Sequence, residues 1–157
     1  MSSTKIMMTP ASPEFCTCLA IRQAARHVSR FYDQHLAQCG LRTTQFSILA
    51  KLKEEGRPLT INRLAEVIVM DRTTLGRNML PLQRDGLIAV TQGTVDRRSK
   101  ELYLTDVGLK RLSEAWTYWA KAQAGFDAAF GSAKDSKLRA LMRAVTSTEL
   151  VVAATKP

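Results

Sequence analysis

The stretch over residues 59–86, LTINRLAEVIVMDRTTLGRNMLPLQRDG, is the part of the sequence that most restricts the fold. Its apolar residues recur at helical spacing, which predicts a short helix over 61–68 and a second helix over 71–85. Thr60 and Asp71 precede these helices, and both are residue types that accept hydrogen bonds from the free amides at a helix N-terminus. Only a tight connection fits between the two segments. The sequence therefore predicts a helix-turn-helix.

The second of these helices has one narrow apolar stripe, formed by Leu75, Met79 and Leu82. Its opposite face carries arginine, threonine and asparagine side chains and must meet water or a partner. The chain of 157 residues has 23 Lys and Arg against 14 Asp and Glu, a net charge of +9. Residues 42–111 hold 13 basic and 8 acidic side chains, which is +5 of that excess. This balance favours a polyanionic partner, with nucleic acid ahead of a membrane surface.

Two short β-prone runs follow, LIAVT and ELYLT, with the polar loop QGTVDRRSK between them. They predict a hairpin with a basic tip. A helix-turn-helix followed by a basic hairpin is the arrangement of a winged helix, in which one helix enters the DNA major groove and the hairpin contacts the backbone or the minor groove. Further helices are expected over residues 13–38, from Thr43 or Thr44 to 53, from Thr105 or Asp106 to a break at 131–132, and over 133–153.

The sequence LTINRLAEVIVMDRTTLGRNMLPLQRDGLI, followed by VDRRSKELYLT, resembles the MarR family of bacterial transcription regulators. The wing carries the family pattern of Asp-x-Arg followed by Leu-x-Leu-Thr. The resemblance implies a mainly α-helical winged helix-turn-helix with a small β-hairpin wing, dimeric through its N- and C-terminal helices. The implied regions are a flexible N-terminus at 1–12, a dimerisation helix at 13–41, the DNA-binding domain at 42–105 and C-terminal dimerisation helices at 106–157.

The resemblance also implies which residues contact double-stranded DNA. These candidates lie on the recognition helix, at the wing tip and at the starts of the two preceding helices: Arg72, Thr73, Thr74, Gly76, Arg77, Arg97, Arg98, Thr44 and Thr60. Without a DNA partner, the same residues form a solvated helix face, helix caps and a charged hairpin tip. In that alternative, Asp96 simply pairs with Arg98 to hold the shape of the wing.

Three positions depart from the family pattern. Val69 stands at the turn where many members have glycine, and a β-branched side chain is strained there if the residue adopts a positive φ. Gly76 replaces a small hydroxyl residue on the exposed face of the recognition helix, so one family base contact is lost, although the backbone could approach DNA more closely. Pro81 lies inside the same helix, where it removes one backbone hydrogen bond, and a bend is expected.

Arg22, Arg26 and Arg30 repeat every four residues on the first predicted helix. Such a repeat is typical of a solvated stripe. The resemblance offers a second interpretation, because family members often bind small anionic aromatic molecules between this helix, the second helix and the long helix after the wing. The candidate effector-binding residues are Arg22, Arg26, Phe46, Trp116 and Trp119.

The three cysteines do not form a disulfide framework and are expected to be reduced thiols. Cys16 and Cys18 lie about 200° apart if both are helical, and we expect them to be buried as small apolar side chains. The alternative is a peroxide-sensing thiol, as in the organic-hydroperoxide branch of the family. His35 and Cys39 are four residues apart, but two ligands do not make a metal site, and no metal or other cofactor is expected.

These features predict a sequence-specific DNA-binding transcriptional regulator, a repressor released from a palindromic operator by a small, anionic aromatic ligand. One alternative is a thiol-based peroxide-sensing repressor of the same fold. Another is a winged-helix protein-interaction module without DNA binding, which Val69 and Gly76 keep open. An enzyme is not expected, because the sequence has no phosphate-binding glycine loop, HExxH motif or nucleophile elbow. The absence of a membrane-length apolar run and of a secretory signal predicts a cytoplasmic location. The family resemblance implies a homodimer.

Overall fold

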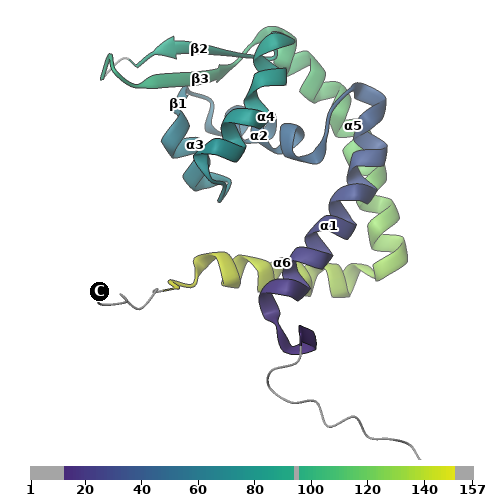
Figure 1. Ribbon diagram of the computed structural model, residues 1–157. Coiled ribbons are helices and arrows are strands. Elements are labelled where there is room, and N and C mark those ends of the chain that lie inside the picture. Colours follow the sequence, from purple (N-terminus) through teal and green to yellow (C-terminus); the bar gives the residue numbers. More distant parts are fainter. Residues whose placement is uncertain (1–12, 94–95, 151–157) are drawn as a thin grey trace, which may run out of the picture. The chain divides into compact units, whose positions relative to one another are not determined.

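The structure is a computed structural model that describes residues 13–93 and 96–150, and it is mainly helical with one small sheet (Figure 1). The expected flexible segment 1–12 lies outside the described residues. The helical elements are the 3-10 turn η1 (Pro13–Phe15), α1 (Thr17–Leu36), the 3-10 turn η2 (Ala37–Cys39), α2 (Thr43–Glu55), α3 (Ile61–Val67), α4 (Arg72–Arg84), α5 (Asp106–Phe130) and α6 (Ser132–Ser147). The strands are β1 (Leu59–Thr60), β2 (Ile88–Gln92) and β3 (Lys100–Leu104). Two compact units meet within α5, the first ending at Trp119 and the second beginning at Ala120.

The first helix is shorter than the predicted helix over 13–38. Cys16 has an extended backbone and caps α1, since its Sγ accepts a hydrogen bond from the Leu19 N–H at 3.3 Å. The last residues of the predicted helix tighten into η2, and Gly40 then stops the chain in a left-handed conformation with φ 71°. The helix therefore begins later and ends earlier than predicted, because a 3-10 turn lies at each end. The predicted stop at Gly40 is confirmed.

The expected threonine cap of α2 is wrong. Arg42 occupies the N-cap position, and its backbone N–H donates to Gln45 Oε1 at 2.9 Å. Thr43 is the first helical residue, and its N–H and its hydroxyl both donate to Asp33 Oδ1, at 2.6 and 2.7 Å. The carboxylate of Asp33 on α1 therefore fixes the start of α2.

The predicted helix-turn-helix is confirmed, including its two caps. Thr60 Oγ1 accepts from the Arg63 N–H at 3.1 Å, and Asp71 Oδ1 accepts from the Thr74 N–H at 2.9 Å. The recognition helix α4 continues through Pro81 to Arg84, so the expected bend does not interrupt it.

The wing is an antiparallel hairpin of β2 and β3, as predicted, with Ile88 opposite Leu104. The sheet has a third strand that was not predicted, in the order β1-β3-β2. This strand, β1, pairs Leu59 with Leu102. Two residues are too few to show the alternation by which a strand is recognised in a sequence.

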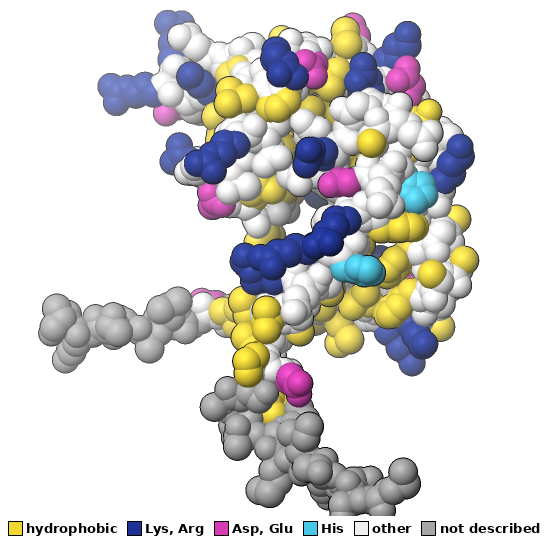
Figure 2. Space-filling model, turned by 45° about the vertical axis from the view of Figure 1, so that its right-hand side comes forward, with side chains coloured by type: hydrophobic (Ala, Val, Ile, Leu, Met, Phe, Trp, Pro, Cys, Tyr) yellow, Lys and Arg dark blue, Asp and Glu magenta, His cyan; other side chains and the backbone are white. Residues whose placement is uncertain are grey.

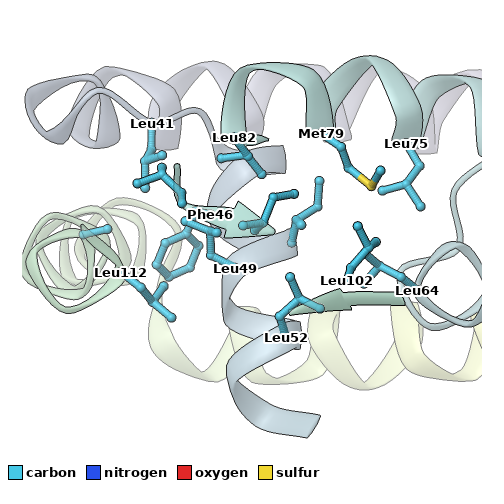
Figure 3. Close-up of a cluster of buried hydrophobic side chains, with 14 of the residues drawn as sticks. Leu41, Phe46, Leu49, Leu52, Leu64, Leu75, Met79, Leu82, Leu102 and Leu112 are labelled. Atoms are coloured by element: carbon cyan, nitrogen blue, oxygen red, sulfur yellow. The ribbon is translucent and has the colours of Figure 1, made fainter. Parts of the chain in front are cut away.

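The core of the first unit lies between the helix-turn-helix, the sheet and the start of α5 (Figure 3). The predicted stripe of the recognition helix lies in this core, with Leu75, Met79 and Leu82 only 0%, 5% and 1% exposed. Leu49 from α2, Leu102 from β3 and Leu112 from α5 are also buried there; all six are labelled in Figure 3. This packing fixes α4 by its apolar side and leaves its polar side free.

In the second unit, α5 and α6 are joined at Gly131, with φ 98°. Asp135 is 4% exposed, and its carboxylate accepts a hydrogen bond from Gln123 Nε2 at 3.0 Å and pairs with Arg139. The helix predicted over 133–153 ends earlier, at Ser147, because Thr148 adopts an extended backbone. Residues 151–153 of that prediction lie outside the described residues.

Candidate nucleic-acid interface

The N-terminal turn of α4 presents polar side chains on its exposed face. Arg72, Thr73 and Arg77 are exposed, as predicted for residues that meet a partner. Thr74 is also exposed, but its hydroxyl and its N–H both bond to Asp71 and thereby lower the pKa of that carboxyl below its ordinary value. Thr74 therefore serves the helix cap in this structure, while the side chains of Arg72, Thr73 and Arg77 are exposed to a ligand.

The described part of the wing tip is organised around Asp96. Its carboxylate accepts from the backbone N–H of Arg98 at 2.9 Å, and its backbone carbonyl accepts from the N–H and the hydroxyl of Ser99, at 3.0 and 2.7 Å. The predicted pairing of Asp96 with Arg98 is thus made to the Arg98 backbone N–H and not to its guanidinium. A Cβ at Gly93 would lie 2.5 Å from the Asp96 carbonyl oxygen, so the turn needs glycine there.

A groove of about 380 Å³ runs between the start of α3, the start of α4 and the wing. It brings together three residues that were predicted from separate parts of the sequence to contact DNA, Thr60, Arg72 and Arg98. The residues that line it are Thr60, Ile61, Asn62, Arg72, Asp96, Arg98, Ser99 and Lys100. Sequence reasoning missed the contribution of Asn62, Ser99 and Lys100, because only the folded hairpin brings the wing against α3.

The charges of this surface are available to an anionic ligand. Arg72, Arg77, Arg97 and Arg98 are exposed, and none of them forms an ion pair with an acidic side chain among the described residues. Figure 2 shows Lys and Arg side chains spread over the face in view, with fewer Asp and Glu side chains between them. Unpaired guanidinium groups beside a helix N-terminus suit phosphate oxygens, because both supply N–H donors and positive charge.

Comparison with known proteins agrees with this geometry. The family model of the MarR family matches residues 41–100, which span the helix-turn-helix and most of the wing. The crystal structure of the transcriptional regulator MosR of M. tuberculosis is 35% identical, with a TM-score of 0.72, and the match covers 87% of this chain and 100% of that chain. The chain belongs to the MarR family of transcriptional regulators.

Two further structures extend the family comparison. MosR of M. tuberculosis in complex with DNA is 36% identical over 86% of this chain and 99% of that chain, with a TM-score of 0.71. Bordetella bronchiseptica BpsR, whose DNA binding is regulated by 6-hydroxynicotinic acid, shares the fold with a TM-score of 0.77 at 18% identity, over 90% of this chain and 100% of that chain. No curated protein sequence matches the chain. The family is one of transcriptional regulators and not of enzymes.

Val69 and Gly76, two of the three residues that depart from the family pattern, have different structural effects. Val69 has φ 52°, the left-handed conformation that favours glycine, and its side chain is 73% exposed, so the turn tolerates a strained β-branched residue. Gly76 is helical, and a Cβ at this position would meet no atom within 4 Å. Packing within the chain therefore does not require glycine at position 76.

The remaining candidates for DNA contact and effector binding are only partly brought together. Phe46, Trp116 and Trp119 form one aromatic cluster, with centroid distances of 4.9 Å from Phe46 to Trp116 and 5.1 Å between the indoles. Phe46 is buried in the core (Figure 3), whereas Trp116 is 43% exposed. Arg22 and Arg26 are exposed on α1. Thr44 is half-buried in the first turn of α2 and does not line the groove beside the wing.

The expected burial of Cys16 and Cys18 is wrong. Both thiols are free and exposed, because Cys16 precedes α1 and the first turns of that helix have no buried side chain within the described chain. Only Cys39 is buried among the three. No described helix combines the length and the apolar character needed to cross a membrane. No group of three or more His, Cys, Asp and Glu side chains suitable for a metal is present in the described part of the chain.

Proposed function

We propose that the protein is a homodimeric repressor that binds a palindromic operator in double-stranded DNA and is released by a small anionic aromatic ligand. The observation that carries the DNA-binding part is the groove in which Thr60, Arg72 and Arg98 meet beside the N-terminus of α4. The complex of MosR with DNA supports it, since that regulator is 36% identical. In this proposal residues 42–105 bind DNA, and residues 13–41 and 106–157 form the dimer.

The DNA contacts divide into two kinds. Arg77 lies one turn into α4, where a side chain reaches base edges when the helix enters the major groove. Arg72 at the start of that helix and Arg97 and Arg98 on the wing hold phosphates. Thr60, Thr73 and Thr44 are neutral donors to the DNA backbone. Gly76 carries no side chain beyond its backbone, which permits close approach of the helix to the DNA.

The test is selection of bound fragments from random DNA, followed by two substitutions. Arg77→Ala should weaken binding to the recovered inverted repeat by about 1–3 kcal/mol and relax specificity at one position, whereas Arg98→Ala should weaken all sequences and reduce the salt slope by about 1. Arg84→Ala is the matched control, because Arg84 lies on the same helix, is exposed and is paired with Asp85. Failure to enrich any DNA would favour the protein-interaction module.

The effector part of the proposal rests on the aromatic cluster of Phe46, Trp116 and Trp119, with Arg22 or Arg26 as the cation that pairs with a carboxylate. The regulation of BpsR by 6-hydroxynicotinic acid, an aromatic acid, supports this ligand class. Titration with a benzoate or cinnamate should lower operator affinity by about 1–3 kcal/mol. A response that survives both Arg22→Gln and Arg26→Gln would rule out their role as ligand partners.

A second candidate is a thiol switch, which the exposure of Cys16 and Cys18 favours. A thiolate attacks the terminal oxygen of the hydroperoxide and the O–O bond breaks, which gives a sulfenic acid and an alkoxide that takes a proton from water to become the alcohol. Oxidation of Cys16 would convert the thiol sulfur that caps α1 into a bulkier sulfenic acid and so disturb this cap. Replacement of all three cysteines by serine separates the candidates: DNA release by organic hydroperoxide should be lost if the switch operates, and release by an aromatic acid should persist.

A further inference from the structure

The start of α5 is anchored directly to the exit of the recognition helix. The Thr105 hydroxyl donates to the Gly86 carbonyl oxygen at 2.6 Å, and the Thr105 N–H donates to the Leu87 carbonyl oxygen at 3.2 Å. A Cβ at Gly108 would lie 2.8 Å from the Leu87 carbonyl carbon, so α5 packs here at a distance that only glycine permits. The segment that leaves α4 is therefore held against α5 through backbone groups.

The next turn of α5 contacts a different segment, the turn that joins α1 to α2. One nitrogen of the Arg111 guanidinium donates to the Cys39 carbonyl oxygen at 3.0 Å. The same nitrogen would lie 3.3 Å from a Cβ at Gly40, so the guanidinium rests on the left-handed residue that ends η2. The Arg111 side chain is 38% exposed, and its Nε lies 3.8 Å from a Glu114 carboxylate oxygen.

The end of the recognition helix is linked to α5 through Gly86 and Leu87, which accept from Thr105. Asp85 is the C-cap of α4, and its hydrogen bond with Arg84 lowers the pKa of its carboxyl, with a smaller effect in the same direction from the charge of Arg111. The start of α5 therefore contacts both the α1–α2 turn, through Arg111, and the segment that leaves α4, through Thr105 and Gly108. All of these residues belong to the first compact unit.

We infer that Arg111 is a positioning residue that fixes the α1–α2 turn relative to the recognition helix and thereby sets how strictly the dimer requires one half-site spacing. The inference rests on the proposed function, in which α1 helps to form the dimer and α4 reads DNA. In a dimer of this kind, the separation of the two recognition helices depends on the geometry between α1 and α4. A loosened α1–α2 turn lets the two helices adapt to operators that are spaced incorrectly.

The test compares R111M and R111K with K110M. Lys110 is exposed, neighbours Arg111 on α5 and loses the same charge on substitution, so K110M is the matched control. Affinity is measured for the selected operator and for versions with one or two base pairs inserted between the half-sites. R111M should reduce the preference for the native spacing about tenfold, within the usual range of coupling between sites. R111K should lie between R111M and the wild type, because it keeps the charge and one donor, and K110M should match the wild type.

Hydrogen exchange gives a readout that needs no DNA. The Leu41 N–H donates to the Leu36 carbonyl within the α1–α2 turn. Its hydrogen exchange should be about tenfold faster in R111M than in K110M, whereas the amides of α4 should exchange at the same rate in both variants. Equal exchange and equal spacing preference in R111M and K110M would overturn the inference. If R111M does not fold, equality of R111K and K110M in both measurements overturns it. If the wild-type protein binds no inverted repeat, the proposed function is refuted. Hydrogen exchange of Leu41 then tests by itself whether Arg111 holds the α1–α2 turn.

Discussion

The recognition helix α4 and the last helix α6 are both amphipathic, but their apolar sides have different surroundings. Leu75 and Leu82 of α4 are at most 1% exposed, whereas Leu141 and Val145 of α6 are 61% and 41% exposed. The apolar side of α4 is covered by its own unit. The apolar side of α6 is exposed in the single chain. In the proposed dimer it is covered by the partner subunit, since exposed apolar surface can mark an interaction site.

The difference shows what helical periodicity can and cannot predict. The same spacing of apolar residues identified both helices, yet it does not say whether the covering surface comes from the same chain. In α6 the side toward α5 is held instead by a polar contact, the buried carboxylate of Asp135 with Gln123 and Arg139. The exposed Leu141 and Val145 are then available for association, as the proposed dimer requires.

The largest expected effect is on the free energy of unfolding and comes from the buried apolar side of α4. Leu75→Ala should lower the free energy of unfolding by about 2–5 kcal/mol at every protein concentration, because it opens a cavity in the core of one chain. Leu141→Ala should instead have an effect that depends on protein concentration, because that side chain is covered only in the dimer. Denaturant unfolding at two concentrations a hundredfold apart measures both. A concentration-independent loss in Leu141→Ala would contradict the comparison.

The second prediction concerns substitutions on the exposed apolar side of α6. Leu141→Glu combined with Val145→Glu should dissociate the dimer and remove tight binding to a two-half-site operator, because two charges cannot be buried unpaired at the interface. Sedimentation and operator titration report the two effects. Ser136→Glu with Ala140→Glu is the control, since helical periodicity places these exposed residues on the opposite side of α6. Tight operator binding by a monomeric double variant would refute the role of α6.

The third prediction separates stability from recognition on the polar side of α4. Gly76→Ala should raise the free energy of unfolding by up to about 1 kcal/mol, because alanine favours the helix and its Cβ meets open space. The same substitution should weaken operator binding, because the methyl group holds the helix away from the DNA. Thermal unfolding and operator titration of the same sample test it. Unchanged or tighter DNA binding would show that glycine has no role in approach to DNA.

The smallest expected effect is at the turn between α3 and α4. Val69→Gly should raise the free energy of unfolding by about 0.5 kcal/mol, because relief of the left-handed strain exceeds the added entropy of the unfolded chain. Operator affinity should stay within error, because Val69 lies outside the groove beside the wing. A stability loss in Val69→Gly would mean that the valine side chain, although 73% exposed, makes a contact worth more than the strain.

Local chemistry explains which features could be predicted from the sequence. Thr60 and Asp71 cap their helices as expected, because each cap depends only on residues within three positions. The cap of α2 could not be predicted, since Asp33, ten residues away, takes both donors of Thr43. The groove beside the wing likewise depends on tertiary contact. The sequence nominated Thr60, Arg72 and Arg98, and only the fold adds Asn62, Ser99 and Lys100.

The buried thiol of Cys39 has a practical consequence for labelling. Its S–H donates to the Leu36 carbonyl at 3.1 Å, and burial raises the pKa of the thiol, so the reactive thiolate is scarce at neutral pH. A maleimide dye should therefore modify the exposed Cys16 and Cys18 rapidly and Cys39 only when the turn under Arg111 opens. The rate of the slow phase of dye incorporation would then report how often that turn opens. A chain carrying Cys39 alone would provide a fluorescent reporter of this opening.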